Sequence, residues 1–435
     1  MSSRTAVVDP DSSLDERLRR TIESEPAAVA DPYPLYHDLL ALPAPYQWGP
    51  TLVVSRFEDI RQIALDSVTF SNRAYSVGSR AEAIRAGLDD DQRVAFDEVA
   101  AFESLYISRS DGEQHARLRG IAHRAFTPRK MADLQALIQS YIDELLEAMA
   151  AEGQRDFVAG FSSRLPIMAI CSLLNVPLAD IDQIKGWSAR IGKNRGGAVV
   201  ADLLDAHAAL MEFRGYVAEI VAHHRRHPDT TDLVSALMGA ADDHQLTEDE
   251  LLATMVVLLF GGSDTTTALL GNGLHTLLTH RDQWRLLAVD PEGRVDATVE
   301  ELARYVSPIQ TTWRVTTESV ELGGISVPAG ATILLLVGAS NRDPEQFEDP
   351  DTFDVERDAK RHLAFFLGSH FCLGASLARL EARATFRTLA ERFPDLAARD
   401  ARAGHRWRGN IQFRTIAELE VDFMESVQTP RRRST

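Results

Sequence analysis

The sequence predicts one mainly α-helical domain with small β-sheets beside the helices. Helical hydrophobic periodicity dominates from Phe126 onward, and strand patterns are few. Neither an internal repeat nor a Pro/Gly/Ser-rich linker divides the 435 residues. We therefore expect a single domain over residues 26–427, preceded by a disordered segment, 1–25, and followed by a disordered basic tail, 428–435.

Strand patterns occur at three places. Residues 51–57 (TLVVSRF), 320–326 (VELGGIS) and 331–337 (ATILLLV) are apolar and β-branched, and turn residues lie beside the last two. These segments predict the small sheets. Residues 72–110 and 193–203 have the least regular pattern, so we expect mobile pocket walls there, with lid hinges at Gly192, Gly196 and Gly197.

Amphipathic or wholly apolar helical patterns cover residues 134–149, 213–226, 246–260 and 295–306. The third has a start signal, since the Thr247 hydroxyl can cap the chain while Glu250 reaches back in a capping box. We expect this helix to run to about His280. Because residues 251–260 are apolar on every side, it should be buried in the centre of the domain.

The middle of that helix contains residues that disfavour a helix. Each of Gly261 and Gly262 costs about 1 kcal/mol relative to alanine in a helix, and Asp264 with the threonines 265–267 prefers caps and turns. A threonine-rich kink is the structural explanation. Residues that disfavour the local structure are more often found at functional sites, so we expect a functional site here.

Composition excludes several classes of function. With 46 Lys and Arg against 64 Asp and Glu, the net charge of −18 disfavours binding to nucleic acid. Cys171 and Cys372 are too few for a disulfide framework, a cysteine-rich zinc site or an iron–sulfur cluster. The N-terminus lacks a signal peptide, and no uninterrupted apolar run reaches about 18 residues. We expect a cytoplasmic monomer that binds no membrane.

The second unusual stretch is HLAFFLGSHFCLGASLARLEAR, residues 362–383. It places Cys372 between a glycine-bearing loop and a helix, where backbone N–H groups and the helix dipole favour a thiolate. Gly368 and Gly374 let the backbone approach a flat cofactor closely. An isolated buried cysteine is usually an apolar filler, and we interpret Cys171 that way.

This stretch resembles the cysteine-ligand loop of the soluble bacterial cytochrome P450 family. HARLR (115–119), GGSDTT (261–266), EELAR (300–304) and PDTFDVER (350–357) occur in the family's order, so the resemblance covers residues 31–425. It implies the P450 fold, with heme b (iron protoporphyrin IX) between the long central helix and the cysteine loop. Cys372 is then the thiolate ligand of the iron, which favours O–O cleavage.

The resemblance also implies roles for other residues. Asp264 and Thr265 match the acid and alcohol that relay protons to dioxygen, and Gly261 leaves room for it. The implied cofactor-binding residues are His115, Arg119, Arg314, Phe365, His370 and Gly374. A buried structural network of Glu301, Arg304 and Arg357 is expected to hold the cysteine loop. Phe366 departs from the family pattern, because a glycine usually stands there, and Leu367 replaces a common aromatic residue.

Electrons must come from other proteins, because the chain has no GxGxxG fingerprint and too few cysteines for an iron–sulfur cluster. We expect ferredoxin and ferredoxin reductase. Between His115 and Lys130 there are five Lys or Arg residues and no acid. This strip is either a solvated face or a docking site for an acidic ferredoxin, and the predicted docking residues are Arg117, Arg124, Arg129 and Lys130.

The substrate pattern indicates a mid-sized, mostly hydrophobic molecule, oxidised by hydroxylation or epoxidation, such as a polyketide macrolide in antibiotic biosynthesis. The predicted substrate residues are Phe96, Phe102, Leu258, Ile309, Trp313 and Ile411. Two alternatives stay open: a hydrolase with Cys372 as nucleophile and His370 as base, and a non-catalytic member of the same fold.

Overall fold

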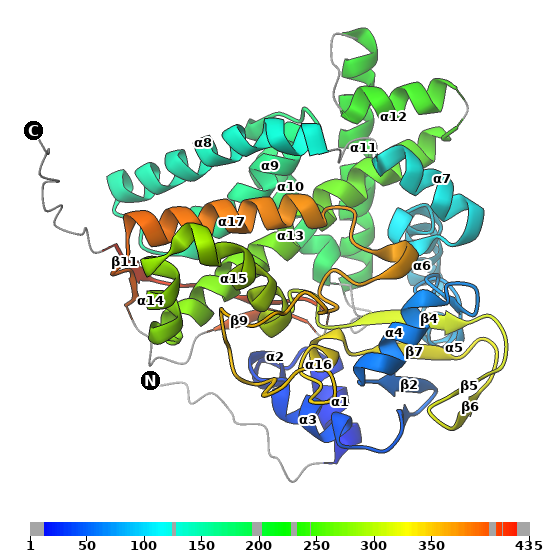
Figure 1. Ribbon diagram of the computed structural model, residues 1–435. Helices are drawn as coiled ribbons and strands as arrows, with labels where there is room; N and C mark the ends of the chain where they lie inside the picture. The colour runs from blue at the N-terminus through cyan, green and yellow to red at the C-terminus, as the bar shows by residue number, and fades with distance from the viewer. Residues whose placement is uncertain are drawn as a thin grey trace, which may run out of the picture.

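The computed structural model describes residues 13–123, 128–193, 202–227, 233–243, 245–399, 406–410 and 412–423. Helices predominate in these ranges, and short strands form small sheets, which confirms the predicted fold class. Figure 1 shows helices packed around the long helix α13, and below them a smaller region where the strands lie beside the N-terminal helices.

The α-helices in chain order are α1 (Leu14–Ile22), α2 (Pro26–Ala30), α3 (Tyr33–Leu40), α4 (Phe57–Leu65), α5 (Ser79–Ala86), α6 (Asp90–Glu103), α7 (Gly112–His123), α8 (Pro128–Glu152), α9 (Leu165–Leu173), α10 (Ile181–Lys193), α11 (Leu203–Arg226), α12 (Leu233–Asp242), α13 (Glu248–Thr279), α14 (Arg281–Val289), α15 (Pro291–Val306), α16 (Val337–Ser340) and α17 (Ala375–Arg392). Shorter helical turns are η1 (Ile107–Arg109), η2 (Val158–Ser162), η3 (Leu178–Asp180) and η5 (Gly368–His370).

The strands are β1 (Tyr46–Trp48), β2 (Thr51–Val54), β3 (Phe70–Ser71), β4 (Thr312–Thr316), β5 (Val320–Leu322), β6 (Ile325–Val327), β7 (Thr332–Leu335), β8 (Ala397–Ala398), β9 (Trp407–Gly409), β10 (Arg414–Ile416) and β11 (Val421–Asp422). The largest sheet has the order β1-β2-β7-β4-β3. In it β2 pairs in parallel with β7, and β4 pairs antiparallel to β7. The predicted strand 51–57 is shorter than expected, because Asp343 accepts a hydrogen bond from the Phe57 N–H (2.8 Å) where α4 begins.

Helix α13 begins and ends where the sequence predicts. The Thr247 hydroxyl accepts from the Glu250 N–H (3.1 Å), and the Glu250 carboxylate accepts from the Thr247 N–H (2.9 Å), which completes the capping box. Among the described residues, α13 is the helix long and apolar enough to cross a membrane, but 67% of its apolar window is buried inside the protein. It is the core helix of the domain.

Close packing around α13 fixes the cysteine helix. A Cβ on Gly273 would lie 2.9 Å from Cζ of Phe386 on α17 and 3.2 Å from Leu302 on α15. Glycine therefore lets α13 approach both helices closely. Because α17 begins just after Cys372, this packing determines how far the cysteine lies from α13.

The segment 72–110 is more regular than we expected. It contains α5 and α6, and α6 has a capping box in which Asp89 and Gln92 exchange side-chain and backbone hydrogen bonds. We overlooked this start signal because the apolar residues that follow it form no continuous stripe. In the other irregular segment, residues 194–201 lie outside the described residues, and with them Gly196 and Gly197.

The expectation of disorder over residues 1–25 does not hold for its second half. Helix α1 occupies residues 14–22, and Leu18 and Ile22 pack with Leu35 and Tyr36 in a small core. One helical face of LDERLRRTI is apolar, which is enough to dock it. Residues 1–12 and 424–435, including the predicted tail, lie outside the described residues.

Candidate functional site

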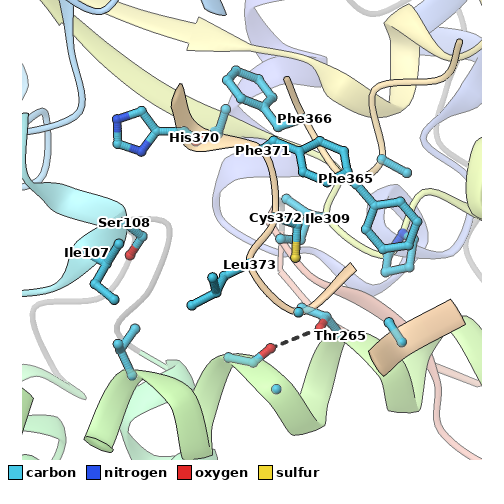
Figure 2. A pocket seen from close by; sticks show the side chains of 18 of the residues that line it. Ile107, Ser108, Thr265, Ile309, Phe365, Phe366, His370, Phe371, Cys372 and Leu373 are labelled. Atoms are coloured by element: carbon cyan, nitrogen blue, oxygen red, sulfur yellow. Dashed lines mark hydrogen bonds between the residues drawn. The ribbon is translucent and has the colours of Figure 1, made fainter. Parts of the chain in front are cut away.

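The loop before α17 holds Cys372 in one conformation. The Cys372 N–H donates to the Phe365 carbonyl at 2.9 Å. Gly368 has a φ of +70°, and a Cβ there would lie 2.8 Å from the Ala64 carbonyl oxygen, so this turn requires glycine. Figure 2 shows the sulfur of Cys372 pointing into an open space toward the helix that carries Thr265.

The environment of the Cys372 thiol differs from the one we expected. The side chain is exposed, but the space it faces is the internal cavity that it lines. Burial raises the pKa of the thiol, and the Gly374 N–H, Arg119 and Arg379 oppose this effect only in part. The helix terminus alone therefore does not make a thiolate here. Coordination to a metal ion is the interaction that would remove the proton.

The four basic side chains predicted to bind the cofactor line the same cavity: His115, Arg119, Arg314 and His370. Arg314 is buried, and desolvation lowers its pKa to about 10. Its guanidinium donates to the Thr312 hydroxyl (3.3 Å) and the Trp313 carbonyl (2.7 Å). Within the described ranges no carboxylate pairs with it. A buried cation of this kind needs an anionic partner.

The rings of the two histidines lie 4.0 Å apart. The buried Nε2 atoms of both have no hydrogen-bond partner among the described residues, and that of His370 lies 3.9 Å from the Asp111 carboxylate. Burial, followed by the charges of His115, Arg314 and Arg119, lowers the pKa of His370 to about 2. These two imidazoles beside two arginines fit the two carboxylates of a heme, with Cys372 placed to bind its iron.

Helix α13 forms the opposite wall. A Cβ on Gly261 would meet nothing within 4 Å, so open space lies beside the helix there. The Thr265 hydroxyl lines the cavity and donates to the Gly261 carbonyl at 3.0 Å (Figure 2). The Thr266 hydroxyl likewise donates to the Gly262 carbonyl at 3.5 Å. Such bonds to the residue four earlier often bend helices, but α13 is one continuous helix through the motif.

Asp264 faces away from the cavity that Thr265 lines. Its side chain is exposed and lies close enough to α10 that its charge acts on Lys185. Successive residues on a helix point about 100° apart, which explains why the two motif residues face different environments. Asp264 therefore lies on the outer surface of the helix, and its neighbour Thr265 lies on the cavity wall.

The predicted structural network is assembled in the core. Arg304 donates to both oxygens of the Glu301 carboxylate at 2.7 and 2.8 Å, and both side chains are fully buried. Arg357 donates to the same carboxylate at 3.3 Å. Arg304 also donates to the Asn341 carbonyl (2.9 Å), and the Asn341 amide oxygen accepts from the Leu363 N–H (2.7 Å). The network therefore reaches the start of the cysteine loop.

A second network lies beside it, which the sequence analysis missed. Glu300 accepts two hydrogen bonds from Arg379 of α17, at 2.6 and 2.8 Å, and one from His362 at 3.2 Å. Burial would raise the pKa of Glu300, but Arg379 and His362 outweigh burial and hold it at about 2. Arg379 also covers the Phe365 ring, 4.2 Å from its centroid. In the sequence, the glutamate next to Glu301 in EELAR was the feature that could have indicated this second network.

The cavity has a volume of about 360 Å³. Leu258 and Ile309 line it, together with the predicted cofactor residues Gly261, Phe365 and Gly374. Phe102, Phe96 and Trp313 lie elsewhere: Phe102 packs on Tyr106, Phe96 lies in a small cluster with Leu88, and Trp313 belongs to the N-terminal core. Ile411 lies outside the described residues. The polar lining residues Asn72, Tyr75, Ser108 and Arg109 lie in the predicted pocket wall 72–110, although none of them was singled out as a substrate residue, and Thr312 and Gln412 also line the cavity.

The predicted docking strip is only partly described. Arg117 does not extend freely into solvent, since it donates to the Glu250 carboxylate at 2.5 and 2.9 Å. Arg119 donates to the Phe371 carbonyl next to Cys372 at 2.6 Å. Arg124 and the side chains of Arg129 and Lys130 lie outside the described residues.

Comparison with known proteins gives a consistent result. A family model described as "Cytochrome P450" matches residues 201–285 and 294–397. The "Polyketide biosynthesis cytochrome P450 PksS" of Bacillus subtilis is 35% identical over 325 residues, which are 74% of this chain and 78% of that protein. The "6-deoxyerythronolide B hydroxylase" of Saccharopolyspora erythraea is 36% identical over 330 residues, 75% of this chain and 80% of that one. The crystal structure of CalO2 matches with a TM-score of 0.81 and 32% identity, over 92% of this chain and 97% of that one.

Proposed function

The chain belongs to the cytochrome P450 family and is a monooxygenase with a heme-thiolate cofactor, and from this premise we propose that it hydroxylates or epoxidises a mid-sized, mostly apolar secondary metabolite. The two relatives support this substrate class, since one is named for polyketide biosynthesis and the other for the hydroxylation of 6-deoxyerythronolide B. The cavity supports it as well, because its α13 wall is apolar around Val257 and Leu258.

One observation carries the chemical part of the proposal. Cys372 and Thr265 face each other across a single cavity that His115, His370 and Arg314 also line (Figure 2). Cys372 would hold the iron, and Arg314 with His115 and His370 would bind the propionates. When bound, the heme supplies the activation of dioxygen. Thr265 holds its hydroxyl proton at the cavity wall, and Asp264 on the outer side exchanges protons with water.

The geometry does not favour a cysteine hydrolase. A base for Cys372 would have to be His370, but burial lowers the pKa of that imidazole to about 2 and leaves it a weak base. A non-catalytic member of the fold would be free to lose the cysteine or the acid and alcohol pair, and this chain keeps Cys372, Asp264 and Thr265.

The test is the carbon monoxide difference spectrum of the purified, dithionite-reduced protein. We expect the strongly red-shifted Soret band of a thiolate-ligated ferrous carbonyl. Cys372→Ser should abolish this band. Cys171→Ser is the matched control, because Cys171 is buried in the α9 core and burial raises the pKa of its thiol to about 12. A red-shifted band that survives Cys372→Ser would refute the assignment.

Bacterial members of the family take electrons from external redox proteins, and for this chain we propose an acidic ferredoxin with its reductase. The basic strip of residues 115–130 on a protein of net charge −18 supports this partner. Since Arg117 is already paired with Glu250, the remaining strip residues are the ones to test. Neutralising Arg124, Arg129 and Lys130 should slow heme reduction and flatten its salt dependence, whereas Arg225→Gln, on an exposed pair of α11, should do neither.

We also propose that the enzyme works in the cytoplasm. Both cysteines are free thiols, which suits a reducing compartment, and Cys372 must stay reduced to bind iron.

A further inference from the structure

The cavity has a polar end at Gln412, whose backbone is held on both sides. The Gln412 carbonyl accepts from the Gln310 N–H (2.8 Å), and the Gln412 N–H donates to the Asn410 side chain (2.8 Å). The next residue, Phe413, forms a β-bridge with Ile309. Gly409 has a φ of +117° and no room for a Cβ, which fixes the turn before it. The Gln412 side chain therefore starts from a rigid position.

The amide of Gln412 is only half satisfied. Its Nε2 donates to the Tyr75 hydroxyl at 3.0 Å, whereas Oε1 is buried and has no hydrogen-bond partner among the described residues. Gln412 as a whole is 9% exposed and lines the cavity. A buried acceptor without a donor is costly, so Oε1 is a vacant acceptor site for whatever enters the cavity.

Tyr75 completes the site from the other side of the fold. It lies between β3 and α5 and also lines the cavity. Since its hydroxyl oxygen accepts from Gln412, its own proton is available for donation. The ring is held in place by the Arg109 guanidinium, 3.8 Å from its centroid, and Arg109 is in turn ion-paired with Glu103. One donor and one acceptor thus lie side by side.

We propose that Tyr75 and Gln412 form a subsite for an alcohol hydroxyl carried by an otherwise apolar substrate. The hydroxyl donates to Gln412 Oε1 and accepts from the Tyr75 O–H, which satisfies both partners at once. This inference rests on the proposed monooxygenase function and names a feature of its substrate. The subsite anchors one end of the molecule and so sets the orientation of the apolar skeleton along α13.

Other polar groups fit less well. A ketone or ether only accepts hydrogen bonds, so it would bind Tyr75 and leave Gln412 Oε1 unsatisfied. A carboxylate would place a negative charge beside that oxygen, and the charge of the nearby Arg109 is offset by Glu103. The remaining cations of the cavity, Arg119 and Arg314, lie on the rim assigned to the cofactor.

The experiment compares two ligands of matched size, cyclododecanol and cyclododecanone, by calorimetric titration of the holoenzyme. We expect the alcohol to bind about tenfold more tightly, as one hydrogen bond to a buried acceptor gives. Gln412→Met, which keeps length and removes the acceptor, should reduce the alcohol to the affinity of the ketone and leave the ketone unchanged. Tyr75→Phe should weaken both ligands. Ser108→Ala is the control, because Ser108 lines the same cavity and should change neither.

Each variant is first checked for the carbon monoxide difference spectrum and for its unfolding midpoint, so that misfolding is recognised. Equal affinities for alcohol and ketone in the wild type would overturn the subsite. So would a preference for the alcohol that survives Gln412→Met or disappears in Ser108→Ala. Absence of the red-shifted carbonyl band, or of binding by either ligand, would instead count against the proposed function itself.

Discussion

The guanidinium of Arg314 lies over the ring of Phe366, 4.8 Å from its centroid. Phe366 has a φ of +55°, in the left-handed region that favours glycine. The chain therefore keeps a glycine-type backbone at this position of the cysteine loop although its residue is phenylalanine. The ring also lines the cavity and packs in the core beneath the sheet. We infer that the ring holds Arg314 in place, and that this contact offsets the strain of the left-handed backbone.

Substitutions at Phe366 separate these two effects. The left-handed conformation costs about 1–2 kcal/mol for a residue with a Cβ, and the cation–π contact contributes about 0.5–2 kcal/mol. Phe366→Ala keeps the strain and loses the ring, so we expect the free energy of unfolding to fall by about 1–2 kcal/mol. Phe366→Gly loses both and should lie within about 1 kcal/mol of wild type. Urea unfolding measures the order, and an alanine variant as stable as the glycine variant would contradict it.

Arg117 is expected to act on stability through Glu250. This ion pair joins α7 to the buried start of α13, and the Glu250 side chain is only 6% exposed. Arg117→Ala leaves that carboxylate without its partner, so we expect a loss of about 1–3 kcal/mol in the free energy of unfolding. The neighbouring pair Arg225–Glu248 is exposed, and Arg225→Ala should cost at most about 0.5 kcal/mol. Equal losses in the two variants would show that the pair at α13 has no special weight.

Glu301→Ala should release the cysteine loop. It removes the partner of the fully buried Arg304 and one hydrogen bond of Arg357, and breaking a buried pair costs about 3–5 kcal/mol. We expect the heme to dissociate faster, measured by its transfer to apomyoglobin. Asp296→Ala is the matched control, since Asp296 lies on the same helix, α15, and pairs with Arg383 at the surface. Heme transfer at the wild-type rate in Glu301→Ala would show that the network does not help to retain the cofactor.

Thr265 is expected to keep electron use coupled to oxygenation. Thr265 lines the cavity beside Gly261, as Thr266 does, whereas Thr267 is buried and does not line the cavity. Thr265→Val removes the proton donor at nearly constant shape. In the presence of cyclododecanol it should release more hydrogen peroxide per NADH consumed than wild type or Thr267→Val. A peroxide yield that rises equally in both variants would point to a packing effect.

The parts of the fold and site predicted from the sequence are those written in local spacing. The capping box of Thr247 and Glu250 lies within four residues, and the glycines and Cys372 of the loop lie within ten. Both were predicted from the sequence. The structural network was predicted from the i, i+3 spacing of Glu301 and Arg304, which is enough to bring two side chains together on a helix.

The parts that the sequence did not predict depend on partners far apart in the chain. Arg117 and Glu250 are 133 residues apart, and Tyr75 and Gln412 are 337 apart. Their meeting is decided by how α7 packs on α13 and how the C-terminal turn lies over the cavity, and no local pattern contains that information. The same reason explains Phe102 and Trp313, whose aromatic rings suit a pocket and a core equally well.

The pH dependence of stability should depend on Glu381 of α17. This side chain is 1% exposed, both its carboxyl oxygens lack hydrogen-bond partners among the described residues, and burial raises its pKa well above the ordinary value. A group whose pKa is raised in the folded state gives stability that is complete below the unfolded pKa and is lost as pH rises toward the folded pKa. Wild type should therefore lose stability through this carboxyl over the pH range above the ordinary pKa of a glutamate.

Glu381→Gln keeps the shape and cannot ionise, so its advantage in unfolding midpoint over wild type should grow with pH across that range. Glu391→Gln provides the control, because Glu391 lies on the same helix with its side chain 54% exposed, and its curve should run parallel to wild type. Thermal unfolding of the holoenzymes in a series of buffers measures all three. A constant difference between Glu381→Gln and wild type at every pH would mean that the carboxyl does not change its protonation on unfolding.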